Sequence, residues 1–362
     1  MNHASMLLRA FRDITVTRGW SLTQWETLIR QARRADVLAS LAVRLREYGV
    51  LESAPPEARA HLDAATILAQ AQERDIRREV LEITAAVEPT GVRPVLLKGA
   101  AYLMTGLPVG RGRLFADVDI LVPHEHLADV EAALMLRGWV TTHHNAYDQR
   151  YYRRWMHELP PMRHLVRQTV LDVHHGILPL TARFRPNPAL LLAAALPVTD
   201  HGDLRVLAPI DMILHSATHL LCNEEFSHGF RDLLDLDGLT RHFSAGEPQF
   251  WTRIARRAVE LDLQRVWYYA MRYCARMLGT PIAPDATTFL DRGEPPLIGG
   301  MMDALFTRAL EVDHPLAANA FSSAARRLLY LRGHWLRMPA HLLAYHLTVK
   351  AFRREEEEHA SP

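Results

Sequence analysis

The sequence has little cysteine and almost no lysine. Cys222 and Cys274 are the only cysteines among 362 residues, which excludes a disulfide scaffold and fits a reducing compartment. Lysine occurs only at positions 98 and 350, and arginine supplies the other basic residues. Because this chain otherwise uses arginine for positive charge, Lys98 is a candidate for a role that needs a compact ammonium group.

Long apolar runs and a strong net charge are absent too. No stretch of 18 or more apolar residues occurs, so no membrane-spanning helix and no stable membrane insertion are expected. The opening residues MNHASMLLRAFRD lack the layout of a signal peptide. Acidic residues number 41 against 42 basic ones, which argues against a general polyanion-binding protein. These features predict a cytoplasmic globular protein.

Hydrophobic spacing divides the chain into three regions. Residues 1–90 carry apolar side chains three and four positions apart and predict an N-terminal helical region. Residues 91–205 alternate strand and helix signals, and the helical period returns over 206–362. The predicted fold class is therefore α+β, with a small mixed-sheet core embedded between N-terminal and C-terminal helical regions.

The central region gives the clearest local signals. Short β-branched runs predict strands, and Gly- or Pro-bounded amphipathic stretches predict helices. The expected strands cover 92–97, 116–122, 139–144, 162–168 and 169–177, and the expected helices cover 100–106 and 124–138.

Three acidic residues in this region predict a metal site. Asp117 and Asp119 are two positions apart on one strand, so their carboxylates point the same way. Two like charges this close are costly unless a cation lies between them. Asp172 lies on another predicted strand with similar apolar neighbours. Oxygen ligands suit Mg²⁺, or Mn²⁺ in its place, and such a set can hold the ion pair of two-metal phosphoryl chemistry.

A phosphate site is predicted beside these acids. Lys98 and Gly99 lie where a strand meets the start of a helix, and Gly99 would let a phosphate approach the backbone. The glycine-rich loop that follows carries Arg111 and Arg113.

The run from Leu97 to Val122, with LDVHHGI after it, resembles an uncharacterised nucleotidyltransferase family of bacteria within the polymerase-β-like nucleotidyltransferase superfamily. The family pattern is L-K-G-a, an Arg four residues before D-[IV]-D-h-L-V, and a later h-D-h-H strand. The matching residues are Lys98, Gly99, Arg113, Asp117, Asp119, Asp172 and His174. Looser matches to the family's helical part are Asp211, His215, His219, Arg231 and Asp235.

The resemblance implies transfer of a nucleoside monophosphate from an NTP, ATP first among them, to a hydroxyl of an acceptor, with release of pyrophosphate. The acceptor is a protein, a tRNA, a sugar or another small molecule such as a natural-product intermediate. In this reading Asp117, Asp119 and Asp172 are catalytic and hold the metal. Lys98, Gly99, Arg111 and Arg113 bind the NTP phosphates, and His174 supports the metal ligands.

Two alternatives stay open. Ala100 stands where the superfamily usually has a phosphate-binding serine, and Leu114–Ala116 replace a serine-containing segment before Asp117. These departures favour a catalytically degenerate protein that binds a nucleotide or a partner. A kinase-like transfer of the γ-phosphate would use similar metal ligands.

Other clusters have simpler explanations. Histidine pairs at 143–144, 174–175 and 215/219 could hold zinc, but no HExxH motif or cysteine pair accompanies them. The basic amphipathic segment 333–354 could lie on a membrane surface, although core packing explains it better. Arginines near the predicted site could contact an anionic acceptor or line a solvated sheet edge; they are Arg150, Arg153, Arg154, Arg163 and Arg167.

Overall fold

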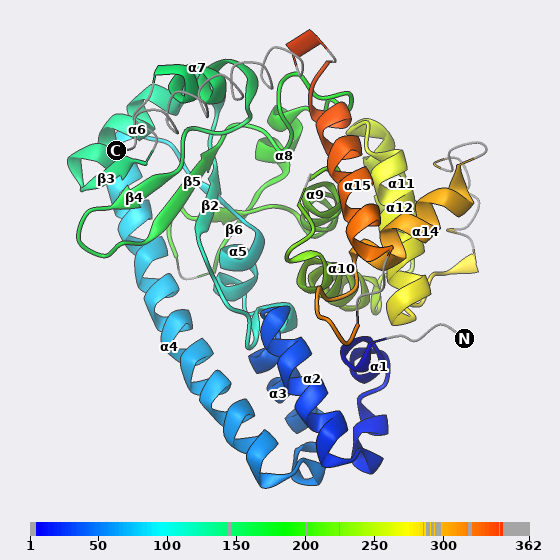
Figure 1. The fold of residues 1–362 in the computed structure, drawn as a ribbon. Coiled ribbons are helices and arrows are strands. Elements are labelled where there is room, and N and C mark those ends of the chain that lie inside the picture. Colours follow the sequence, from blue (N-terminus) through cyan, green and yellow to red (C-terminus); the bar gives the residue numbers. More distant parts are fainter. Residues whose placement is uncertain are drawn as a thin grey trace, which may run out of the picture.

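The computed structural model describes residues 5–142, 146–199, 201–223, 225–284, 286, 290, 293, 298–317, 321–339 and 341–342. It is α+β, with a mixed sheet flanked by helices, and confirms the predicted fold class. N-terminal helices lie at one end, and the sheet and the C-terminal helices lie side by side at the other (Figure 1).

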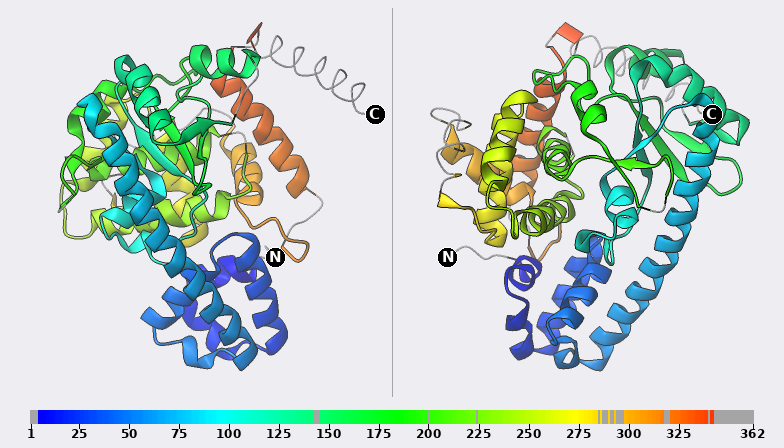
Figure 2. Two further views of the ribbon diagram at one scale, coloured as in Figure 1. Left: turned by 90° about the vertical axis from the view of Figure 1, so that its left-hand side faces the viewer. Right: turned by 180° about the vertical axis from the view of Figure 1, so that it is seen from behind.

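The N-terminal part is helical, as predicted. Its α-helices are α1 (Met6–Arg12), α2 (Leu22–Arg34), α3 (Leu38–Glu47) and α4 (Pro56–Val87), and its 3-10 helices are η1 (Ile14–Gly19), η2 (Leu51–Ser53) and η3 (Glu88–Thr90). Proline at the first position starts α4 without losing a helical hydrogen bond. Ile76, Val80, Ile83 and Val87 form one buried stripe at helical spacing. This long helix therefore reaches from the N-terminal helices to the sheet, as Figure 2 shows.

The sheet has the strand order β3-β4-β5-β2-β1-β7-β6. Its strands are β1 (Val95–Leu97), β2 (Val118–Leu121), β3 (Trp139–Thr141), β4 (Met162–His164), β5 (Val170–His174), β6 (Leu196–Pro197) and β7 (Arg205–Val206). The β2–β5 and β1–β7 pairs are parallel, and the other neighbouring strands are antiparallel. Every residue of β1 and β2 is buried, so the centre of the sheet is covered on both faces.

The helices of the central region connect these strands. They are α5 (Lys98–Met104), the 3-10 helices η4 (Pro108–Gly110) and η5 (His124–His126), α6 (Leu127–Leu136), α7 (Ala146–Trp155) and α8 (Pro188–Ala194). Helices α5 and α6 both pack against α4. The predicted strands and helices of this region are all present within their expected ranges or close to them, whereas α7, β6 and β7 are additions.

The C-terminal part is a helical assembly. It contains α9 (Pro209–Cys222), α10 (Gly229–Ser244), α11 (Phe250–Glu260), α12 (Gln264–Tyr273), the π-helix η6 (Cys274–Leu278), α14 (Gly299–Ala309) and α15 (Ser322–Arg337). Helix α9 packs against α10, α11, α12 and α15, and it also contacts α5. Helix α10 contacts η4. The C-terminal helices therefore form a wall beside the start of α5 and the loop that precedes β2.

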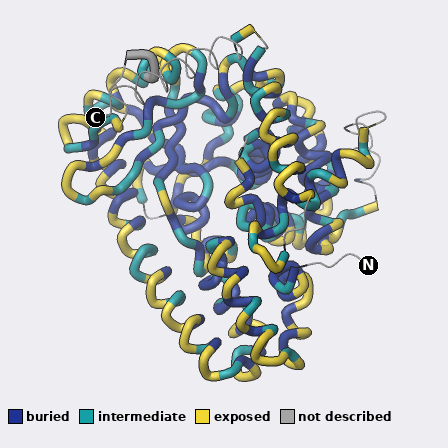
Figure 3. Tube along the Cα trace, in the orientation of Figure 1, coloured by how far each residue is buried: buried dark blue, intermediate teal, exposed yellow. Residues whose placement is uncertain are grey.

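Burial follows this arrangement, with the sheet centre and helix α9 almost wholly inside (Figure 3). Within the described residues, none of the helices combines the length and the apolar character needed to cross a bilayer.

Candidate active site

Two of the three predicted carboxylates lie directly opposite each other on neighbouring strands. Strands β2 and β5 run parallel, and their register pairs Asp119 with Asp172. Carboxylate oxygens of these two residues and a ring nitrogen of His174 lie within 4.8 Å of one another. The period-two alternation of both strands thus places the acids on the same face of the sheet.

Asp119 is the most strongly held of the acids. It is 3% exposed, and its Oδ1 accepts a hydrogen bond from Lys98 Nζ at 2.7 Å and lies 2.9 Å from His174 Nε2. Burial alone would raise the pKa of Asp119, but the Lys98 charge and the His174 hydrogen bond hold it well below its usual value. The other ring nitrogen of His174, Nδ1, lies 3.2 Å from Glu158 Oε2. His174 therefore bridges two carboxylates, and Asp119 stays ionised.

One carboxylate oxygen of Asp172 is buried without a partner in the described part of the chain. Its Oδ1 is fully buried and has no hydrogen-bond partner among the described residues. Burial, together with the Asp119 charge, raises the pKa of Asp172 to about 7. A buried polar atom without a partner is costly, and a divalent cation between Asp119 and Asp172 would satisfy it. The donor set of carboxylate oxygens suits Mg²⁺ or Mn²⁺. The residues present thus fit the predicted metal.

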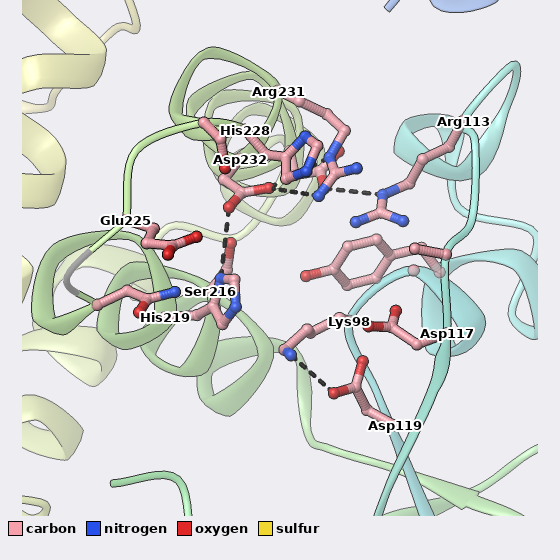
Figure 4. Close-up of a pocket in the computed structure, with 16 residues that line it drawn as sticks. Lys98, Arg113, Asp117, Asp119, Ser216, His219, Glu225, His228, Arg231 and Asp232 are labelled. Atoms are coloured by element: carbon pink, nitrogen blue, oxygen red, sulfur yellow. Dashed lines mark hydrogen bonds and ion pairs between the residues drawn. The ribbon is translucent and has the colours of Figure 1, made fainter. Parts of the chain in front are cut away.

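A cavity of about 200 Å³ opens next to this cluster. Sheet-side residues Lys98, Arg113, Asp117 and Asp119 form one wall, and residues of α9, α10 and the connection between them form the other (Figure 4). Burial and the neighbouring Asp119 charge raise the pKa of Asp117. Five acidic residues line the cavity against three lysine or arginine residues; the acids are Asp117, Asp119, Glu225, Asp232 and Asp235, and the bases are Lys98, Arg113 and Arg231.

Lys98 occupies a strained position between the strand and the helix. It begins α5 with φ +46°, which is uncommon for a residue with a side chain. Burial would lower the pKa of Lys98, but Asp119 and Asp117 raise it above its usual value. The ammonium group is therefore charged, and it lies beside the carboxylates at the wall of the cavity.

Gly99 lines the cavity and lies against Arg113 and Phe115. A Cβ atom at this position would lie 2.8 Å from Arg113 Cζ and 3.1 Å from Phe115 Cε1. The Arg113 guanidinium thus packs against the side of Gly99 that a Cβ atom would occupy. Arg113 Nε donates to Asp235 Oδ2 at 2.9 Å, and both side chains are 10% exposed. This buried ion pair joins the loop before β2 to α10.

A comparison with models of known protein families identifies the family of this chain. A family model described as "Uncharacterised nucleotidyltransferase" matches residues 21–279. The chain belongs to this nucleotidyltransferase family. A comparison with curated proteins gave no match. The family match extends from α2 to the end of η6 and so includes both walls of the cavity, which confirms the resemblance stated for the 97–122 run.

The helical wall of the cavity carries a second polar cluster. His219 Nδ1 lies 3.4 Å from Asp232 Oδ2, and Arg231 Nη2 lies 3.2 Å from Asp232 Oδ1. Burial would raise the pKa of Asp232, but His219 and Arg231 hold it well below its usual value. His219 and Arg231 were matched to the family pattern, whereas Asp232 was missed because adjacent charged residues on a helix carry no signal of their own.

Several predicted residues lie away from the cavity. Arg111 pairs with Glu47 at 3.1 Å and lines a separate cavity beside α3, so it is not brought together with the acids. Asp211 pairs with Arg257 at 2.7 Å between α9 and α11. His215 is 5% exposed, and burial lowers its pKa well below the usual value.

The predicted arginine and histidine clusters have the following surroundings. Arg153 pairs with Glu131 at 2.6 Å, and Arg167 pairs with Glu79 at 2.6 Å. Ligand atoms of His157, Glu158 and His174 lie within 4.8 Å of one another, and of these three residues only His174 is predicted from the sequence. The histidine pair at 143–144 and most of the amphipathic segment 333–354, beyond α15, lie outside the described residues.

Proposed function

We propose that this protein transfers a nucleoside monophosphate from an NTP, with ATP the first candidate, to a hydroxyl group of an acceptor and releases pyrophosphate. The acceptor classes are those named above: a protein, a tRNA, a sugar or another small molecule. The observation that carries the proposal is the pairing of Asp119 with Asp172, whose buried Oδ1 has no hydrogen-bond partner among the residues that the structure describes.

Asp119 and Asp172 would hold a divalent cation, Mg²⁺ or Mn²⁺, with Asp117 completing the set from the cavity wall. Such an ion, when bound, withdraws charge from the phosphoryl group and lowers the pKa of a bound hydroxyl. His174 orients Asp119 through its hydrogen bond and is itself fixed by Glu158.

Charge explains why nucleotide and metal would bind together. The cavity has more acidic than basic residues, so its side chains alone would repel a triphosphate. Bound divalent cations would reverse that balance. Lys98 and Arg113, which both line the cavity, would then bind the phosphates and stabilise charge on the departing pyrophosphate.

The test is incubation of the purified protein with NTPs labelled at the α- or γ-phosphate, Mg²⁺ and a cell lysate as the source of acceptor. We expect label from the α-position, and none from the γ-position, on an acceptor. Asp119→Asn should lower the rate by about 10²–10³-fold or more. Asp129→Asn, the same change at an exposed helical position, should leave it unchanged.

Three other outcomes of this experiment would contradict the proposal. Transfer of the γ-label would indicate a kinase-like reaction. Nucleotide binding without any transfer would indicate the degenerate protein, and labelling by Asp119→Asn at the wild-type rate would refute the metal-ligand assignment.

A further inference from the structure

Among the ionisable groups in the cavity, His219 differs from the metal-binding carboxylates in its origin and its surroundings. It lies on α9, in the wall opposite Asp117 and Asp119 (Figure 4). Its side chain is 31% exposed, whereas His215, one turn earlier, is buried and does not line the cavity. His219 thus reaches the cavity from the side opposite Asp117. It therefore faces the space that an acceptor would enter.

Asp232 determines which nitrogen of His219 is basic. The low pKa of Asp232 keeps this carboxylate ionised, and an ionised carboxylate can only accept hydrogen bonds. His219 Nδ1, at 3.4 Å from Asp232 Oδ2, must then carry the hydrogen of a neutral ring. The lone pair is left on Nε2, and no described residue forms a hydrogen bond to that atom. A carboxylate that fixes the tautomer of a histidine is the usual arrangement for a general base.

Asp172, the other candidate base, is less well placed. It does not belong to the residues that line the cavity, and its carboxylate, whose ligand atom lies within 4.8 Å of those of Asp119 and His174, suits metal binding. An acceptor hydroxyl in the cavity would therefore meet His219 before it could reach the Asp172 carboxylate.

We propose that His219, held by Asp232, takes the proton from the acceptor hydroxyl during nucleotidyl transfer; this inference rests on the proposed function. The acceptor oxygen forms a bond to the α-phosphorus, and the bond from that phosphorus to the bridging oxygen of the leaving pyrophosphate breaks. The hydroxyl proton passes to Nε2 of His219, which later releases it to water.

The test compares His219→Gln and His219→Ala with the wild type, with α-labelled ATP, Mg²⁺ and the lysate as probes. We expect the transfer rate to fall by about 10²–10⁴-fold, while the Kd of a fluorescent ATP analogue stays within about twofold. Added imidazole should restore part of the activity of His219→Ala, because it can fill the space left by the ring. His242→Gln, an exposed histidine on α10, is the matched control and should behave as wild type.

The failures of the two proposals are distinguishable. If the wild type transfers no α-label from ATP or another NTP, the proposed function fails and this inference with it. If the wild type transfers label and His219→Gln does so at the same rate, only the inference fails. An equal loss of nucleotide affinity and rate, or no rescue by imidazole, would indicate a binding or structural role and would also contradict the inference.

Discussion

The buried pair between Arg113 and Asp235 permits a quantitative test of how the two cavity walls are joined. Asp235→Asn keeps the size of the side chain and removes its negative charge. Arg113 would then remain buried beside Gly99 with no carboxylate on its Nε. The change therefore isolates the charge of one partner without creating a cavity.

The expected cost follows from burial. Removal of one partner of a buried ion pair typically costs about 3–5 kcal/mol, because an unpaired charge is left inside. Asp232 also stabilises the charge of Arg113, which places the expected loss near the lower limit, about 3 kcal/mol. Arg253 and Glu247 form a pair with the same 2.9 Å separation on the surface. Glu247→Gln should cost only about 0.5 kcal/mol or less, because exposed ion pairs contribute little.

The assay is urea unfolding of the three proteins, with free energies from linear extrapolation. A loss for Asp235→Asn several times that for Glu247→Gln supports the reasoning. If both variants lose the same small amount, burial does not govern the energy of this pair, and the reasoning is refuted.

Three further predictions concern the cavity and the pH dependence of stability. Lys98→Met should tighten Mn²⁺ binding, measured by titration calorimetry, because it removes the ammonium group that competes for the carboxylates. The same change should weaken ATP binding. Unchanged affinities for both ligands would contradict the placement of Lys98 between the carboxylates and the phosphates. Gly99→Ala should destabilise the protein by about 1–3 kcal/mol because the new methyl displaces Arg113, while Gly19→Ala, with open space around it, should be nearly neutral in the same thermal melt. Burial raises the pKa of Glu311 from 4.5 to about 7, so the folded state binds its proton more tightly and stability is lost as pH rises from about 4.5 to 7. The change in unfolding free energy caused by Glu311→Gln should therefore be more favourable at pH 8 than at pH 4, by roughly 1–2 kcal/mol after a reduction for partial solvent exposure. An equal change at both pH values would refute this prediction.

The parts of the site that sequence could predict are those set by local periodicity. Alternation along β2 and β5 places Asp119 and Asp172 on one face, and the structure pairs them in register. The buried stripe of α4 likewise follows from apolar residues spaced three and four positions apart. The strands β6 and β7 have two residues each, so they are too short to show an alternation of apolar and polar residues in the sequence.

Contacts between segments far apart in the chain could not be predicted from the sequence. Arg113 and Asp235 are separated by 122 residues, and nothing in either local pattern shows that they meet. The expected phosphate role of Gly99 follows from the absence of its side chain, but the contact of this position with Arg113 cannot be read from the sequence. The pairing of His219 with Asp232 likewise depends on how α9 packs against α10.

The claim that carboxylates from two strands hold divalent cations beside a nucleotide is tested most directly by crystallography. Crystals grown with Mn²⁺ and an ATP analogue that cannot be cleaved at the α-phosphate should show anomalous density between Asp119 and Asp172. Lys98 should then contact a phosphate rather than Asp119 Oδ1. Manganese bound elsewhere, with Lys98 still on Asp119, would contradict the account.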